Sequence, residues 1–185
     1  DGSSVAISAI YNAENGYFSG HVRIYQYANG SWTQIGDDIN GEARGDESGR
    51  SVSLSSDGSV VAIGAPNNRP NNNLPYDQLV KDRYYGHVRI YQNIGGVWTQ
   101  IGDDIYGESN ENYSGWSVSL SADGSVVAIS ANTNDGNGTD SGHVRIYRNN
   151  NGTWTQLGSD IDGEAANDLS GSSVSLSSDG SIVAV

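Results

Sequence analysis

The sequence predicts an all-β chain built from β-propeller blades, each a four-stranded antiparallel meander. Three observations support this fold class: one segment repeats three times, strand-like runs alternate with tight-turn residues, and no helical periodicity appears. Each copy of the segment opens on Asp-Gly-Ser. The copies are repeat 1 (1–56, beginning inside a blade), repeat 2 (57–122, with a long insert at 67–85), repeat 3 (123–178) and the start of a further repeat (179–185).

Each repeat holds four short runs with strand character. In the second copy of this strand pattern, which begins just before the Asp-Gly-Ser of repeat 2, these runs are 51–55, 60–63, 87–91 and 97–101. The first and third alternate apolar with polar residues, which is the period of a strand whose two faces differ. Hairpin turns are predicted at Asp57-Gly58 between the first two runs, and at Asn29-Gly30, Gly95-Gly96 and Asn151-Gly152 between the last two. The strands of one repeat therefore form a meander.

A sheet of this size cannot bury both faces alone, so neighbouring repeats must stack on it. Radial stacking gives a β-propeller, whereas a linear β-solenoid is the competing architecture. The hairpin turns favour antiparallel strands and hence the propeller. Because the chain opens at one strand (5–7) and stops at its counterpart (182–185), we expect about three repeats of a longer array.

The composition excludes several classes of function. Twenty-two acidic against nine basic side chains give a formal charge of −13, which repels nucleic acid and anionic lipid. The absence of Cys rules out disulfides and thiolate metal sites. No apolar run approaches the length that crosses a bilayer, so no membrane insertion is expected.

Four N-x-[ST] triplets occur in predicted turns, at Asn29, Asn112, Asn137 and Asn151. Such triplets also arise by chance in a chain rich in Asn, Gly, Ser and Thr. If they carry glycans, the protein is a secreted glycoprotein.

Three segments resemble the FG-GAP repeats of the integrin α-subunit propeller. They are the Ser-Gly-Trp-Ser-Val-Ser-Leu run 114–120, the Val-Ala-Ile-Gly-Ala-Pro run 61–66 and the Gly-His-Val-Arg-Ile-Tyr run 86–91. The leading Phe-Gly of the family stands here as Ser-Gly, and only repeat 2 has Gly-Ala-Pro. The resemblance implies a propeller, typically of seven blades, that recognises another protein or a glycan outside the cell or at its surface. Three repeats do not close such a ring, so further blades or other subunits must complete it.

The family's calcium loop is reduced here to a turn with one carboxylate, Asp57, and its repeats, so we do not transfer its function. A better calcium candidate is the variable loop 132–140. Its oxygen-bearing side chains are Asn134, Asp135, Asn137 and Asp140. Hard cations take six to eight oxygen ligands, and a flexible polar loop is the alternative interpretation.

The insert 67–85 is the candidate partner-binding loop, because a segment that does not repeat is not required by the blade. Its candidate contacts are Arg69, Tyr76, Lys81, Arg83 and Tyr84, to which we add the non-repeating Trp116. Tyr and Arg are enriched at binding hot spots. The alternative is a loop lengthened by drift, which costs little stability.

The repeated side chains are expected to be structural. His21, His87 and His143 lie in separate blades, and Trp32, Trp98 and Trp154 are expected to fill the gaps between sheets. Exposed tryptophans would instead stack on sugars. We also expect ion pairs, within or across blades, between two repeated sets: Arg23, Arg89 and Arg145, and Glu42, Glu108 and Glu164.

No catalytic constellation is evident. The pairs Asp37-Asp38 and Asp103-Asp104 suggest glycosidase carboxylates, but their recurrence in the linker indicates turn residues. We therefore expect a non-enzymatic, extracellular propeller fragment that presents loops for recognition or adhesion. The alternatives are a self-assembling structural repeat of a surface fibre and a carbohydrate-binding propeller.

Overall fold

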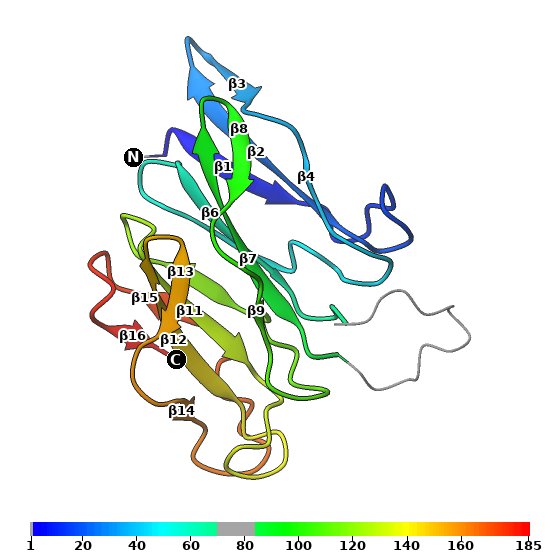
Figure 1. Cartoon of the computed structure of the whole chain (residues 1–185), viewed down its shortest axis with the longest axis vertical. Coiled ribbons are helices and arrows are strands. Elements are labelled where there is room, and N and C mark those ends of the chain that lie inside the picture. Colours follow the sequence, from blue (N-terminus) through cyan, green and yellow to red (C-terminus); the bar gives the residue numbers. More distant parts are fainter. Residues whose placement is uncertain (1, 70–83) are drawn as a thin grey trace.

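The computed structural model describes residues 2–69 and 84–185, and these form β-strands, turns and loops without a helix. No helix that could span a membrane is therefore found in this part of the chain. The strands build three successive antiparallel sheets and a fourth of two short strands (Figure 1).

The first sheet contains β1 (Ser4–Ser8), β2 (His21–Ala28), β3 (Ser31–Gln34) and β4 (Ile39–Asn40). The second contains β5 (Ser51–Leu54), β6 (Val60–Ala65), β7 (His87–Ile94), β8 (Val97–Gln100) and β9 (Ile105–Tyr106). The third contains β10 (Val118–Leu120), β11 (Val126–Ala131), β12 (His143–Asn150), β13 (Thr153–Gln156) and β14 (Ile161–Asp162). The last, two-stranded sheet pairs β15 (Ser175–Leu176) with β16 (Val183–Ala184).

The predicted meander is confirmed, since β5, β6, β7 and β8 pair in sequence order and β10 to β13 repeat the pattern. The sheets are offset from the sequence repeats, because β5 lies within 1–56 but is hydrogen-bonded into the second sheet. The sheets stack in sequence order and, within the described residues, do not close into a ring (Figure 1).

A short linker strand, which is not predicted from the sequence, joins each of the three larger sheets. The linker strands β4, β9 and β14 each pair with the first two residues of the long central strand. In the second sheet, His87 faces Tyr106 and Val88 faces Ile105. This pairing brings the linker carboxylates close to the start of the His-Val-Arg-Ile-Tyr strand.

Both kinds of predicted hairpin are present. The two central residues of the Asn29-Gly30, Gly95-Gly96 and Asn151-Gly152 turns all have positive φ, as a type I′ turn requires. The Asp57-Gly58 turn is different, because only Gly58 has positive φ (+72°). There the Asp57 carboxylate accepts hydrogen bonds from the Ser55 hydroxyl and from the Ser59 backbone N–H, which closes a longer loop.

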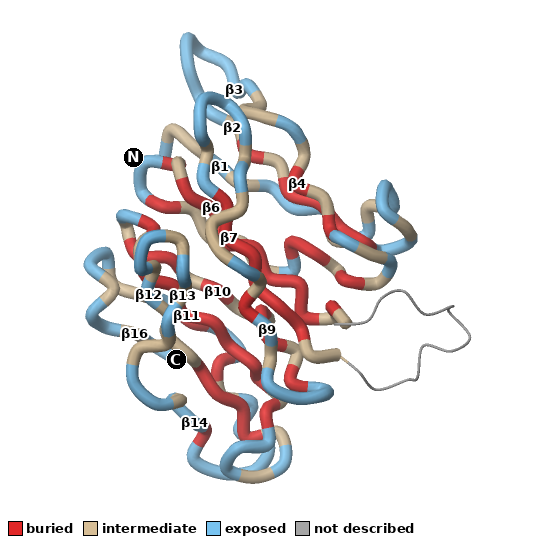
Figure 2. Tube along the Cα trace, in the orientation of Figure 1, coloured by how far each residue is buried: buried red, intermediate tan, exposed pale blue. Residues whose placement is uncertain are grey.

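The middle sheet is covered on both faces. Along β6, Val60 and Ala62 pack toward the third sheet, while Val61 and Ile63 pack toward the first. All residues of β6 are buried, and Figure 2 shows the buried tube running through the centre of the stack. Burial of both faces explains why this run reads as continuously apolar rather than alternating.

The repeated serines of the first strand join neighbouring sheets. Ser53 Oγ accepts a hydrogen bond from the Leu120 N–H of the next sheet, at 3.0 Å, and Ser119 Oγ accepts one from Leu176 N–H at the same distance. The Ser51 hydroxyl donates to the Gly115 carbonyl at 2.8 Å. The polar positions of the Ser-Val-Ser-Leu run therefore hold successive sheets in register.

Candidate functional site

The repeated tryptophans join one sheet to the sheet before it. The indole N–H of Trp98 donates to the Ile35 carbonyl, and that of Trp154 donates to the Ile101 carbonyl, each at 2.8 Å. Both rings also pack against the core between the sheets. The predicted packing role is confirmed for these two, whereas Trp32 is 49% exposed on the outer side of the first sheet.

Two of the three repeated arginines pair across the sheets with linker glutamates of the preceding sheet. Arg89 Nη1 lies 3.4 Å from Glu42 Oε1, and Arg145 Nη2 contacts Glu108 Oε1. The sequence alone allows these pairs either within or across repeats, and the structure places both across repeats. Arg23 instead binds Asp38 of its own sheet, with both Nε and Nη2 donating to the carboxylate.

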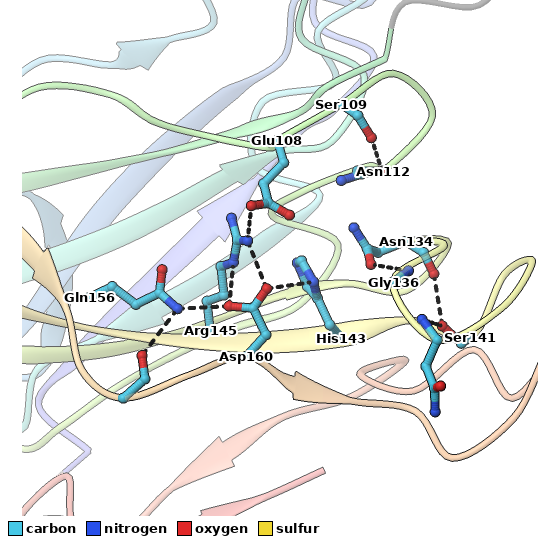
Figure 3. A network of polar contacts seen from close by, with 12 residues as sticks. Glu108, Ser109, Asn112, Asn134, Gly136, Ser141, His143, Arg145, Gln156 and Asp160 are labelled. Atoms are coloured by element: carbon cyan, nitrogen blue, oxygen red, sulfur yellow. Dashed lines mark hydrogen bonds and ion pairs between the residues drawn. The ribbon is translucent and has the colours of Figure 1, made fainter.

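Each repeated histidine lies beside a linker aspartate of its own sheet. The Nδ1 atoms of His21, His87 and His143 lie 3.3 to 3.5 Å from Oδ2 of Asp38, Asp104 and Asp160, respectively. The three histidines are buried, and their Nδ1 atoms complete no hydrogen bond. Figure 3 shows this arrangement in the third sheet, where His143 points toward Asp160 and Arg145 lies between Asp160 and Glu108.

Burial and charge set the protonation of these groups. Burial, together with the charge of Arg145, lowers the pKa of His143 and favours the neutral imidazole. Burial raises the pKa of Asp104, but its contacts with His87 and Gln100 outweigh burial and hold that pKa below its usual range. Hydrogen bonds from Arg23 similarly lower the pKa of Asp38 to about 2. The aspartates are therefore ionised at neutral pH.

A glutamate completes each of these histidine–aspartate pairs. The three potential ligand atoms of each group lie within 4.8 Å of one another. The groups are Glu14, His21 and Asp38; Glu42, His87 and Asp104; and Glu108, His143 and Asp160. One imidazole nitrogen and two carboxylate oxygens are suitable donors for a divalent cation.

Sequence reasoning missed these groups, because the aspartates were interpreted as turn residues and the histidines as unrelated strand residues. A signal was present in the constant spacing, since Asp38, Asp104 and Asp160 each follow a histidine of the repeat by the same number of positions (38 − 21 = 104 − 87 = 160 − 143 = 17). Equal spacing in the sequence does not show that the two residues touch. The contact arises because the linker strand pairs with the central strand.

Aromatic and arginine side chains gather in the loops at one end of the sheets. Arg69 donates to the Tyr84 hydroxyl at 2.7 Å, and Tyr84 stacks on Tyr113 with ring centroids 5.3 Å apart. Arg50 lies over the ring of Trp116, 4.4 Å from its centroid. The candidate contacts Arg69, Tyr84 and Trp116 are thus tied to neighbouring side chains, while Tyr76, Lys81 and Arg83 lie outside the described residues.

Repeat 1 carries a second aromatic group in the equivalent loops. Tyr11 and Tyr17 are each 66% exposed, and Phe18 is 50% exposed. Tyr11 and Phe18 meet edge to face at 5.2 Å, and Arg44 lies over the Tyr17 ring. The sequence does not indicate this group, since the exposure of an aromatic residue in a loop cannot be read from the sequence.

Several polar side chains of the candidate calcium loop are engaged in hydrogen bonds within the protein. Asn134 Oδ1 accepts the Gly136 N–H at 2.7 Å, and Asp135 Oδ1 accepts the Asp140 N–H at 2.8 Å. The Asn137 amide donates to the backbone carbonyls of Gly163 and Glu164 in the linker. These bonds account for the loop's composition, and calcium binding there stays a prediction.

The four glycosylation triplets differ in exposure. Asn29, Asn137 and Asn151 are exposed. Asn112 is only 2% exposed, and its Nδ2 atom is buried. The prediction for Asn112 is therefore incompatible with the folded repeat, because an attached glycan must reach solvent.

Two equivalent clefts lie beside the packed tryptophans. Each has a volume of about 290 Å³. One is lined by Asp37, Asp38, Tyr91 and Trp98, and the other by Asp103, Asp104, Tyr147 and Trp154. Aromatic rings beside carboxylates form a surface on which a sugar could stack and donate hydroxyl hydrogen bonds.

Comparison with known proteins shows similarity at the level of fold. The sequence matches no protein-family model and no curated protein. A solved structure of Kuenenia stuttgartiensis hydrazine synthase superposes with a TM-score of 0.58 at 14% identity, over 98% of this chain and 52% of that chain. This chain thus spans about half the length of that neighbour, and at this identity the similarity concerns the fold alone.

Proposed function

We propose that the chain is a non-enzymatic segment of a β-propeller-like array that presents loops for recognition of a protein or glycan outside the cell. The observation that carries this proposal is a division between repeated and non-repeated residues. The repeated Trp, Arg, His and Ser side chains contact their own or neighbouring sheets. Loops that vary between repeats carry exposed aromatic residues with an arginine beside them.

The loop end of repeats 1 and 2 is the proposed recognition surface. Its exposed members are Tyr11, Tyr17 and Phe18, with Arg44 beside them. Aromatic rings supply a large contact area at low entropic cost, and arginine adds charged donors on a chain that is otherwise acidic. FG-GAP-like architecture, extracellular location and ring closure belong to the same proposal.

The test is binding of the fluorescently labelled chain to a glycan array and to a panel of extracellular-matrix proteins. A variant with Tyr11, Tyr17 and Phe18 changed to Ser should lose the binding that the wild type shows. Tyr27→Ser is the matched control, because Tyr27 is 49% exposed but lies in the β2 strand next to the hairpin of the first sheet. Equal losses in both variants, or no binding by the wild type, would contradict the proposal.

The two clefts favour carbohydrate binding as a second candidate function. Asp37 and Asp103 are exposed at the cleft rims and are the aspartates least tied to the interface. The double variant Asp37→Asn and Asp103→Asn should then lose the glycan-array signal. The variant with Tyr11, Tyr17 and Phe18 changed to Ser should keep that signal. If the second variant loses the signal and the first keeps it, recognition belongs to the loop end.

A further inference from the structure

We propose that Glu42, His87 and Asp104 form a binding site for one divalent transition-metal ion, and that Zn²⁺ fits this site best. The site lies between the first and second sheets, because Glu42 comes from the linker of the first and the other two residues belong to the second. It does not depend on the proposed recognition function.

The distances between the ligand atoms match a small tetrahedral ion. His87 Nδ1 lies 3.3 Å from Asp104 Oδ2 and 3.9 Å from Glu42 Oε2. Bonds of about 2.0 to 2.2 Å from zinc to nitrogen and oxygen separate tetrahedral ligand atoms by roughly 3.3 to 3.6 Å. Both distances from His87 lie within a few tenths of an ångström of that range, and all three ligand atoms lie within 4.8 Å of one another. Calcium, by contrast, prefers a larger, all-oxygen shell.

His87 provides the observation that points to a ligand. Its side chain is 1% exposed, and Nδ1 is buried without completing a hydrogen bond. An unpaired buried nitrogen costs stability, and the lone pair of a neutral imidazole is a common metal ligand. A cation between His87 and the two carboxylates would satisfy that lone pair.

The surrounding residues orient both carboxylates. Gln100 donates to Asp104 Oδ1 at 2.8 Å, and the Tyr106 hydroxyl donates to Asp104 Oδ2 at 3.0 Å. Arg89 contacts Oε1 of Glu42, while Oε2 lies on the His87 side. Such outer hydrogen bonds fix ligand orientation in metal sites. The two carboxylates and Arg89 together carry one net negative charge, which attracts a cation.

The equivalent groups in the other two sheets are already occupied by arginine. Arg23 and Arg145 each donate from Nη2, at 2.7 Å, to the same aspartate oxygen that faces the histidine. In the second sheet, Arg89 donates instead to the Asn40 carbonyl at 3.0 Å and leaves Asp104 Oδ2 to Tyr106. The guanidinium thus takes the cation's place in two groups, and we assign the metal to the middle one.

Solvent reaches the middle group at its glutamate, since the Glu42 side chain is 43% exposed, while the Asp104 side chain is 14% exposed. An ion can therefore enter the folded protein from the Glu42 side.

The test is zinc binding by the chain without a polyhistidine tag, after EDTA treatment and dialysis into metal-free buffer. Titration calorimetry with ZnCl₂ and elemental analysis should show one equivalent of zinc per chain. His87→Asn should weaken binding at least about 10- to 100-fold, by comparison with losses seen at zinc sites. His143→Asn and His21→Asn are matched controls and should retain the single equivalent.

A second variant and a second signal keep the test decisive if His87→Asn fails to fold. The Glu42 side chain is 43% exposed, so Glu42→Gln should fold and should still weaken zinc binding. Co²⁺ should give the visible absorption of a tetrahedral nitrogen–oxygen site, which both variants reduce. No saturable zinc binding, three equivalents per chain, or an equal loss in His143→Asn would overturn the assignment.

Discussion

The indole nitrogen of Trp154 donates a hydrogen bond to the backbone carbonyl of Ile101, 2.8 Å away in the preceding sheet. The same bond joins Trp98 to Ile35 one sheet earlier. One side chain per repeat thus supplies both apolar packing and a directional bond between sheets. In an array whose units contact mainly their neighbours, such interfaces contribute much of the stability.

Trp154→Phe should lower the free energy of unfolding by about 1 to 3 kcal/mol, because it leaves the Ile101 carbonyl without its donor and shrinks the ring. Urea denaturation followed by circular dichroism measures the change. Trp32→Phe is the matched control, and its effect should be small because Trp32 is 49% exposed. Equal losses in the two variants would show that the bond between sheets contributes little.

Gly102→Ala should destabilise the protein more than Gly158→Ala. The two glycines have nearly the same φ, +74° and +72°, so the backbone strain of an alanine is shared. A Cβ on Gly102 would lie 2.4 Å from the Gly152 carbonyl oxygen, whereas one on Gly158 meets nothing within 4 Å. The difference between the unfolding free energies of the two variants therefore measures the cost of the clash between sheets. We expect this difference to be about 1 to 3 kcal/mol.

The sequence predicted those features that depend on local patterns. Strand positions followed from period-two alternation, and the hairpins at Gly30, Gly96 and Gly152 followed from their dipeptides. The role of Trp98 and Trp154 followed from recurrence, because a large aromatic in every unit fits a repeated interface. The linker strand β9, by contrast, contains only Ile105 and Tyr106, and two residues are too few to show the alternation that predicts a strand.

The candidate site depends on contacts that no local pattern encodes. The ion pair of Arg89 with Glu42 joins residues of different sheets, and the sequence offered partners within the repeat equally. The proximity of His87 and Asp104 arises only when β9 pairs with β7. The burial of Asn112 likewise depends on packing of the linker against its neighbours, which a glycosylation triplet does not report.

Arg89→Met should lower the stability of the stack. Arg89 is 7% exposed, pairs with Glu42 and donates to the Asn40 carbonyl of the preceding sheet. Its loss leaves that carbonyl unpaired, and since Glu42 remains partly solvated we expect a cost of about 1 to 3 kcal/mol. Thermal melting provides the measurement, with the exposed Arg148→Met as control. An unchanged melting temperature for Arg89→Met would show that the bridge between sheets is dispensable.

Acid should destabilise the protein between about pH 4 and pH 2, through the aspartates that bind the repeated arginines. Hydrogen bonds from Arg23 lower the pKa of Asp38 from 3.8 to about 2, and hydrogen bonds from Arg145 also lower the pKa of Asp160. A carboxyl whose pKa is lower in the folded state stabilises the fold fully above the unfolded value. That stabilisation is lost as the pH falls from the unfolded pKa through the folded pKa, because protonation then favours the unfolded chain.

Asp38→Asn should therefore flatten the fall in melting temperature between pH 4 and pH 2, while lowering the melting temperature at pH 7. Asp37→Asn, at the exposed neighbouring position, removes the same charge and should leave the slope as in the wild type. Melting temperatures at half-unit pH steps, at constant ionic strength, measure both slopes. If the two variants respond alike, net charge rather than the Arg23–Asp38 pair governs acid stability.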